Sequence, residues 1–258
     1  MISKFNGAIR IGLSLKYLYT KSKSRSELQF NANLLVVKKE VYASIAKICI
    51  ESFLHFHPKS TVTVHVDEAT RVALNHQLKK ALKRGNIRIE TIENQHLTWQ
   101  ELKLNLILSL TGLSEFFMDA DLKWNGTLNE LSDITFFVKE FQFNHNLEYR
   151  PLTAKKWFKT HTLASMKNTS FFYWGNYNPS LQDKQFIDEV MCRIRELSTD
   201  GDKDLEFIQS TIRISEQIAL SLLVEKTGRP IRYLKDSDGY KDGAFVESTY
   251  FGATGTSF

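Results

Sequence analysis

The chain has 258 residues, of which 42% are hydrophobic and 24% are charged. This composition is that of an ordinary globular protein and excludes extensive disorder, and the length suits one large α/β domain. The formal net charge is +5, but most of the excess lies before residue 30, where six Lys and Arg residues face the single acid Glu27. Because the remainder is close to neutral, the charge gives little support to nucleic-acid binding.

Residues 1–30 are predicted to form a basic extension, a helix followed by a polar linker. The apolar stretch 9–19 is interrupted by two basic residues, and it falls short of the roughly 20 apolar residues of a membrane span. No clear signal-peptide cleavage site follows it. We therefore expect a cytoplasmic protein, in which Cys49 and Cys192 are two buried free thiols of a reducing compartment. Peripheral contact of the extension with an anionic membrane is one interpretation, and a solvated helix is the other.

Residues 31–258 are predicted to form a single domain in which strands and helices alternate. Apolar and β-branched runs indicate strands, and apolar residues at helical spacing indicate helices. In chain order we expect a strand at 33–37, a helix at 41–56, a strand at 61–66, a helix at 69–84, a strand at 87–92, a helix at 99–110 and a strand at 115–118. Thr98 and Glu101 predict a capping box at the start of the third helix. Such alternation implies a largely parallel sheet with helices on both faces.

The second half of the chain has a less regular pattern. Strands are expected at 134–138, 169–174 and 231–234, and helices at 181–197 and 216–227, the last capped by Ser215. The tail from residue 235 is rich in Gly, Ser, Thr and Asp. It is predicted to be a loop region that can fold over a ligand.

The most informative motif lies in the segment 116–121, where an apolar strand ends in Asp119 and Asp121 with only the small Ala120 between them. In open α/β sheets, ligands bind beyond the carboxyl ends of the strands. Asp67, at the end of the second predicted strand, shares that position. Two carboxylates there suit Mn²⁺ or Mg²⁺, which prefer oxygen ligands and can bridge to diphosphate oxygens. The alternative is structural: two acids that end a strand and cap the next turn.

With its flanking segments, this motif resembles that of the DxD glycosyltransferases of the GT-A fold, which use nucleotide-sugar donors. The similar segments occur in the same order: 99–104 before the motif, 166–173 after it, and 215–220 with an acid followed by Gln. Only the Asp119–Asp121 motif is specific, and the similarity covers roughly residues 31–234. The resemblance implies a GT-A-like, Rossmann-like α/β domain that transfers a sugar.

The resemblance also implies roles for the residues of the donor side. Asp121 would bind the metal, Asp119 the metal or the donor ribose, and Lys103 the donor phosphates or sugar. Trp99 and Asp67 would also bind the donor. For Lys103 the alternative is a solvated helix lysine, and for Asp67 it is a simple cap at the end of a strand.

On the acceptor side, the resemblance implies that Glu216 acts as a general base toward the acceptor hydroxyl or holds that hydroxyl. The alternative is an acid favoured at a helix N-terminus by the helix dipole. One departure from the family is the lack of a late His, since no His follows His161. Asp236, Asp238, Asp242 or water would then complete the metal shell.

Three other classes of protein share parts of this pattern. A haloacid-dehalogenase-type phosphohydrolase also has Asp-x-Asp after an apolar strand, but normally after the first strand. A nucleotidyltransferase needs a Gly-rich loop after the first strand, where residues 36–40 contain no Gly. A non-catalytic sugar-binding protein has no need of two clustered carboxylates. We therefore expect sugar transfer from a nucleoside-diphosphate sugar, with a UDP-sugar as first choice, to a saccharide, lipid-linked or protein acceptor.

Overall fold

The computed structural model describes residues 26–37, 41–83, 85–93, 96–128, 131–140, 166–199, 215–234 and 246–248. The predicted N-terminal helix and most of the tail lie outside these residues, and the division of the chain at residue 30 stays a prediction. Phe30 itself belongs to the core, with 6% of its surface exposed. Its backbone carbonyl accepts a hydrogen bond from the N–H of Thr61.

The first half of the domain has the predicted alternation. Its elements are β1 (Asn31–Val36), α2 (Val41–Phe56), β2 (Thr61–Val66), α3 (Glu68–Leu82), β3 (Ile87–Thr91), α4 (Trp99–Ser109) and β4 (Glu115–Met118). The predicted bounds of α2, β2 and β4 are confirmed. The bounds of the other elements differ from the predicted bounds by one or two residues at one or both ends. The ends of helices and strands fray and are the least sharply defined part of an element.

The second half contains β5 (Leu122–Trp124), β6 (Ile134–Glu140), β7 (Met166–Tyr173), α7 (Leu181–Thr199), α9 (Ser215–Thr227), β8 (Ile231–Tyr233) and β9 (Val246–Ser248). The bounds of the predicted elements differ by up to three residues at an end, and Ser215, predicted to cap the last helix, is the first residue of α9. Two further strands were not predicted. The short β5 was not expected, and β9 lies in the tail that was expected to form loops. The two pair with each other in antiparallel fashion, with Leu122 opposite Ser248.

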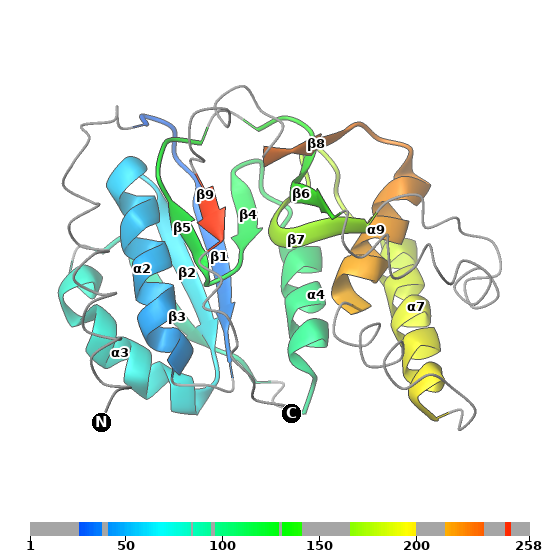
Figure 1. The fold of residues 1–258 in the computed structure, drawn as a ribbon, viewed down its shortest axis with the longest axis horizontal. Coiled ribbons are helices and arrows are strands. Elements are labelled where there is room, and N and C mark those ends of the chain that lie inside the picture. The colour runs from blue at the N-terminus through cyan, green and yellow to red at the C-terminus, as the bar shows by residue number, and fades with distance from the viewer. Residues whose placement is uncertain are drawn as a thin grey trace, which may run out of the picture.

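The main sheet has seven strands in the order β3-β2-β1-β4-β7-β6-β8. The strands β3, β2, β1 and β4 are parallel, as predicted, whereas β7 runs antiparallel to both β4 and β6. The chain order reverses between β1 and β4, because α2 and α3 lead outward from β1 and α4 brings the chain back to β4 (Figure 1). In open sheets, ligands bind beyond the carboxyl ends of the two strands at such a reversal.

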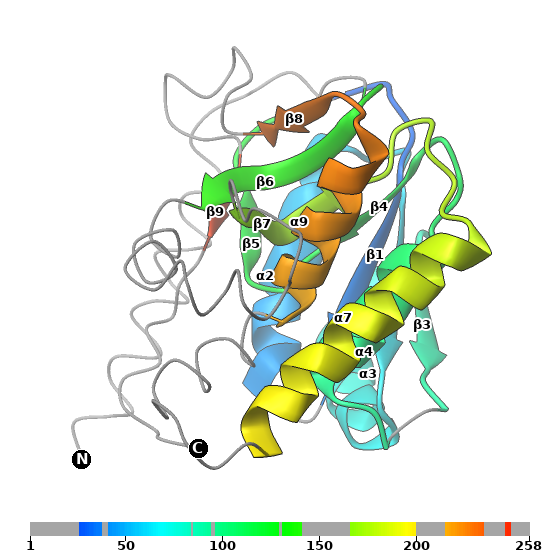
Figure 2. The ribbon, with the colours of Figure 1, turned by 90° about the vertical axis from the view of Figure 1, so that its right-hand side faces the viewer.

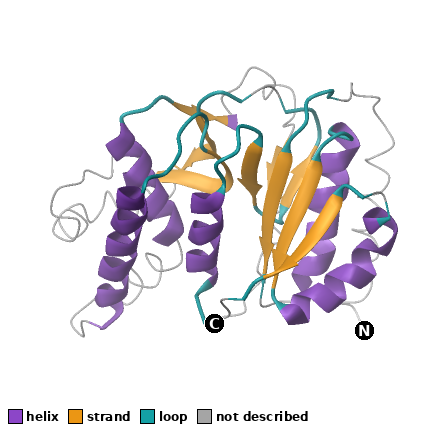
Figure 3. Ribbon diagram, turned by 180° about the vertical axis from the view of Figure 1, so that it is seen from behind, coloured by secondary structure: helices purple, strands orange, loops and turns teal. Residues whose placement is uncertain are grey.

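Two hydrophobic cores lie on opposite faces of this sheet. The alternating side chains of β4 divide between them: Phe116 and Met118 pack with α2 and α3, and Phe117 packs with α4, α7 and α9. From behind, β1–β3 lie in front of α2 and α3 (Figure 3), and from the side α4, α7 and α9 lie together (Figure 2). The prediction of helices on both faces is confirmed. Burying each of these large side chains contributes about 1.5–3 kcal/mol.

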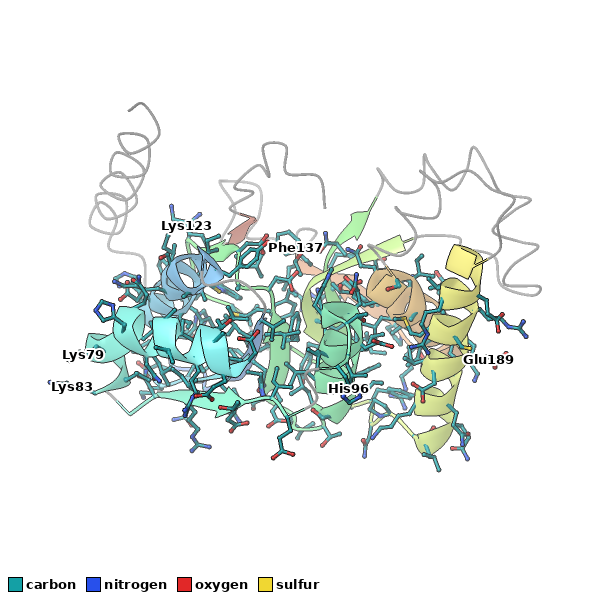
Figure 4. The ribbon with its side chains drawn as sticks, turned by 90° about the horizontal axis from the view of Figure 1, so that it is seen from below. Lys79, Lys83, His96, Lys123, Phe137 and Glu189 are labelled. Atoms are coloured by element: carbon teal, nitrogen blue, oxygen red, sulfur yellow. The ribbon has the colours of Figure 1, made fainter. Side chains whose placement is uncertain are left out.

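The ends of the molecule carry charged side chains on the outer sides of helices. Lys79 of α3 and Lys83, just after this helix, point outward at one end, and Glu189 of α7 points outward at the other (Figure 4). All three are exposed. None of the described helices combines the length and apolar character needed to cross a bilayer.

Gly175, in the turn after β7, has a backbone conformation and a close contact that both require glycine. Its φ is +64°, and an added Cβ would lie 2.7 Å from the carbonyl oxygen of Ser132. Gly228 is a matched control, because its φ is +63° but no atom lies within 4 Å of an added Cβ. We expect Gly228→Ala to cost about 1 kcal/mol and Gly175→Ala about 3 kcal/mol in the free energy of unfolding. Urea unfolding of both variants checks this; equal losses would show that the contact with Ser132 does not matter.

Candidate active site

The two acids of the motif lie on the turn that joins β4 to β5. The backbone N–H of Asp119 donates to the carbonyl of Ser170 in the neighbouring β7 (2.7 Å), and the N–H of Leu122 donates to the carbonyl of Asp119 (3.3 Å). These two bonds fix the backbone on either side of Asp121. The carboxylates therefore lie at the carboxyl end of β4, where the chain order of the sheet reverses.

Lys103 is brought to this turn by α4. The predicted capping box is confirmed: the side chain of Thr98 accepts from the N–H of Glu101, whose own side chain accepts from the N–H of Thr98. One turn into the helix, Lys103 is only 3% exposed, and its Nζ donates to both carboxylate oxygens of Asp119, at 2.9 and 3.2 Å. The predicted role of Lys103 toward the donor phosphates or sugar stays a prediction. The alternative of a solvated lysine is wrong, because a buried ammonium group requires such a partner.

Glu216 also approaches this lysine. It lies in the first turn of α9, 1% exposed, with Oε1 3.8 Å from the Nζ of Lys103. Among the described residues, its Oε2 has no hydrogen-bond partner. Burial raises the pKa of Glu216 to about 7, although the charge of Lys103 acts in the opposite direction. The structure thus joins three of the predicted site residues, Asp119, Lys103 and Glu216, in one ionic cluster.

Asp121 is close enough to Asp119 for their charges to repel. Burial and then the charge of Asp119 raise the pKa of Asp121 to about 6, while Lys103 acts to lower it. Beneath the turn lies Cys49, with its sulfur 3.6 Å from the carbonyl oxygen of Asp119. Burial and the two carboxylates raise the pKa of this thiol. Cys49 is buried as predicted, whereas the prediction of a buried Cys192 is wrong, because this residue lies on the solvent side of α7.

The other predicted donor-binding residues lie at or just before the starts of α3 and α4. Asp67 follows β2 and caps α3, its Oδ1 accepting from the N–H of Thr70 (2.7 Å). Trp99 is the first residue of α4, one turn before Lys103, and 41% of its surface is exposed. An exposed indole is a surface on which a flat ring can stack. The donor-binding roles of both residues stay predictions.

The contact of Lys103 with Asp119 and the burial of Glu216 were not predicted from the sequence. A signal for the first was present, because Lys103 lies between Leu102 and Leu104 on the buried side of α4. A lysine among apolar residues of a buried helix face needs a carboxylate partner, and the motif supplied the nearest acids.

Comparison of the sequence with known families and curated proteins gave no match. Similar solved structures do exist. The bifunctional glycosyltransferase WbbM aligns over 74% of this chain and 38% of its own, with 10% identity and a TM-score of 0.50. The galactosyltransferase LgtC, solved with donor and acceptor sugar analogues, aligns over 70% and 69%, with 14% identity and a TM-score of 0.44. Mouse xyloside xylosyltransferase 1 aligns over 80% and 85%, with 11% identity and a TM-score of 0.44.

The likeness to WbbM, together with the strand order, gives the domain the GT-A-like α/β fold that the sequence predicted. The resemblance to GT-A glycosyltransferases is thus confirmed at the level of the fold. The chain spans only 38% of the length of WbbM, so it matches one part of that protein.

Proposed function

We propose that the protein transfers a sugar from a nucleoside-diphosphate sugar to a hydroxyl group of an acceptor. The observation that carries the proposal is the place of Asp119 and Asp121, at the carboxyl end of β4 where the chain order reverses. WbbM, which has a similar fold, is described as a glycosyltransferase. The motif follows the fourth strand of the chain, which favours this proposal over a haloacid-dehalogenase-type phosphohydrolase.

A divalent cation, Mn²⁺ or Mg²⁺, fits this pair of acids. The charge of Asp119 raises the pKa of Asp121, and a bound cation would relieve that repulsion. We propose that Asp121 binds the metal and that Asp119 shares it or binds the donor ribose. Such a metal neutralises charge on the departing nucleoside diphosphate. The further ligands suggested by the sequence, Asp236, Asp238 and Asp242, lie outside the described residues.

The protein's own groups would orient the donor around this pair. Lys103 fixes the carboxylate of Asp119 through both oxygens, which holds it in one orientation for the incoming donor. Trp99, exposed at the start of α4, would stack against the donor, and Asp67 would contact the nucleoside from the end of β2. In this proposal the acceptor is a saccharide, a lipid-linked sugar or a protein. The protein is cytoplasmic, and residues 1–30 contact an anionic membrane.

A thermal-shift screen tests the donor site directly. We expect one nucleotide among UDP, GDP, CMP and dTDP, with UDP as first choice, to raise the Tm by about 5 °C or more at roughly 100 times its Kd, and to need Mn²⁺. Asp121→Ala should abolish the shift. Asp188→Ala, an exposed acid on α7, is the matched control and should keep it. If no nucleotide shifts the wild type with any metal, the donor site is refuted.

A further inference from the structure

The three charged groups of the cluster lie at increasing depth. The side chain of Asp119 is 29% exposed, that of Lys103 is 3% exposed and that of Glu216 is 1% exposed. Asp119 is therefore the member of the cluster that is open to a ligand from solvent, whereas Lys103 and Glu216 are buried. A general base must come within about 2.6–3.2 Å of the hydroxyl it deprotonates. Glu216 has its nearest charged neighbour in Lys103, which also pairs with the more exposed Asp119.

The ammonium group of Lys103 is held on three sides. Both oxygens of Asp119 accept hydrogen bonds from it, and the ring of Phe117 lies 4.9 Å away. Glu216 lies at 3.8 Å, too far for a hydrogen bond but close enough for strong electrostatic attraction at this depth. A lysine has a flexible four-carbon stem, so its charge stays in one place only when its surroundings hold it there.

Glu216 is itself fixed in place by the packing of α9. Its neighbours on that helix, Ile218 and Ala219, are fully buried, and α9 belongs to the same core as α4. Because burial raises the pKa of Glu216 to about 7, its carboxylate carries a negative charge beside Lys103 once the pH is above that value. This charge matters most when an anionic donor competes with Asp119 for Lys103 and a cation competes with Lys103 for Asp119.

We infer that Glu216 is a positioning residue that acts through Lys103: it holds the lysine against Asp119 while the donor binds, and it does not touch the acceptor. The inference rests on the proposed function, because it assumes that this site binds a sugar-nucleotide donor. It replaces the role of general base that the sequence suggested for this residue.

The test measures the binding of UDP with Mn²⁺ at about pH 8.5, where Glu216 is ionised, without any acceptor, to wild type, Glu216→Gln, Lys103→Met and the double variant. Glu216→Gln keeps the shape of the side chain and removes its charge. We expect it to weaken UDP binding about 10-fold in wild type and to have no further effect in the Lys103→Met background. A general base is not needed for binding the donor alone. Unchanged UDP affinity in Glu216→Gln would therefore overturn the inference.

Glu225→Gln is the matched control. Glu225 lies on the same helix and forms an ion pair with the buried Lys167 at 2.7 Å. Removing the charge of Glu225 therefore tests whether the loss of another ion pair on α9 also weakens UDP binding. We expect Glu225→Gln to change stability and leave UDP affinity unchanged. An equal loss of UDP affinity in Glu225→Gln would show that Glu216 has a merely structural role.

A second measurement needs no ligand and separates this inference from the proposed function. In protein labelled with ¹⁵N at the lysine Nζ, the buried ammonium of Lys103 should give a protected NMR signal, assigned by its loss in Lys103→Met. Glu216→Gln should shift this signal or increase its exchange with solvent, and Glu225→Gln should not. An unmoved signal in Glu216→Gln would contradict the inference. If wild type binds no nucleotide, the proposed function fails, and the NMR signal still decides whether Glu216 positions Lys103.

Discussion

Replacing Asp121 with Asn is expected to stabilise the protein and abolish its activity. The buried carboxylate of Asp121 is repelled by Asp119, and its pKa is raised to about 6. A carboxyl group whose pKa is raised on folding destabilises the folded protein at neutral pH, and this cost is lost as the pH falls from about 6 toward the ordinary value of 3.8. The neutral amide of the same shape avoids the cost at every pH.

Without metal or nucleotide at pH 7, we expect Asp121→Asn to gain on the order of 2 kcal/mol in the free energy of unfolding. Urea unfolding in EDTA measures this gain, which should vanish at pH 4. The same variant should lose sugar transfer by about 100-fold or more, since even a group outside a metal's ligand shell is often worth 10- to 100-fold. Asp188→Asn controls for the change of charge. A destabilised or fully active Asp121→Asn would contradict the assignment of this residue.

Acid is expected to destabilise the protein through His57. This residue is fully buried. Its Nε2 accepts a hydrogen bond from the N–H of Leu128 (2.7 Å), so we assign the proton to Nδ1, which donates to the carbonyl of Phe53 (3.2 Å). The ring stacks on Phe53 at 4.6 Å. Burial lowers the pKa of His57 from its ordinary 6.5 to about 4.

Because the unfolded chain takes up this proton more readily, the contribution of His57 to stability is lost as the pH falls from about 6.5 toward 4. We expect the contribution of His57 to the free energy of unfolding to fall by about 2 kcal/mol between pH 8 and pH 5, while the raised pKa values of Asp121 and Glu216 act in the opposite direction. Urea unfolding of wild type and His57→Gln across this range measures the contribution as the difference between their slopes. His76→Gln, at an exposed position on α3, should keep the slope of the wild type. The same slope in both variants would assign the acid sensitivity to other groups.

Much of the first half of the fold could be predicted from the sequence. The helical spacing of Ile45, Cys49 and Phe53 gave α2, and the unbroken apolar run before Asp119 gave β4. Both signals are local, since they depend on which face of one element is buried. The parallel direction of β1–β4 followed from the helices between them.

The second half depends on contacts that local patterns do not record. The strand β5 has three residues, too short for a periodic signal, and its partner β9 lies far along the chain. The antiparallel direction of β7 comes from its pairing with β4, where Phe117 lies opposite Phe172. Such pairing between distant segments is set by tertiary packing.

For the candidate site, the positions of the two acids could be predicted from the sequence, but the burial of Lys103 and Glu216 could not. Asp119 could be found because a strand end is visible in the sequence. The direct ion pair with Lys103 and the burial of Glu216 depend on how α4 and α9 pack against β4. An acidic residue in the first turn of a helix gives the same sequence pattern whether its side chain faces solvent or a buried lysine.

The pairing of β5 with β9 constrains when the site can form during synthesis. The turn that carries Asp121 leads directly into β5, and β5 gains its partner only when residues 246–248 are available. The segment from β1 to β4 contains its own strands and crossover helices and can begin to fold earlier. On the ribosome, the acids of the motif would therefore be synthesised long before the neighbouring strand is complete. Emergence of residues 246–248 from the ribosome then becomes the step that completes the pairing of β5.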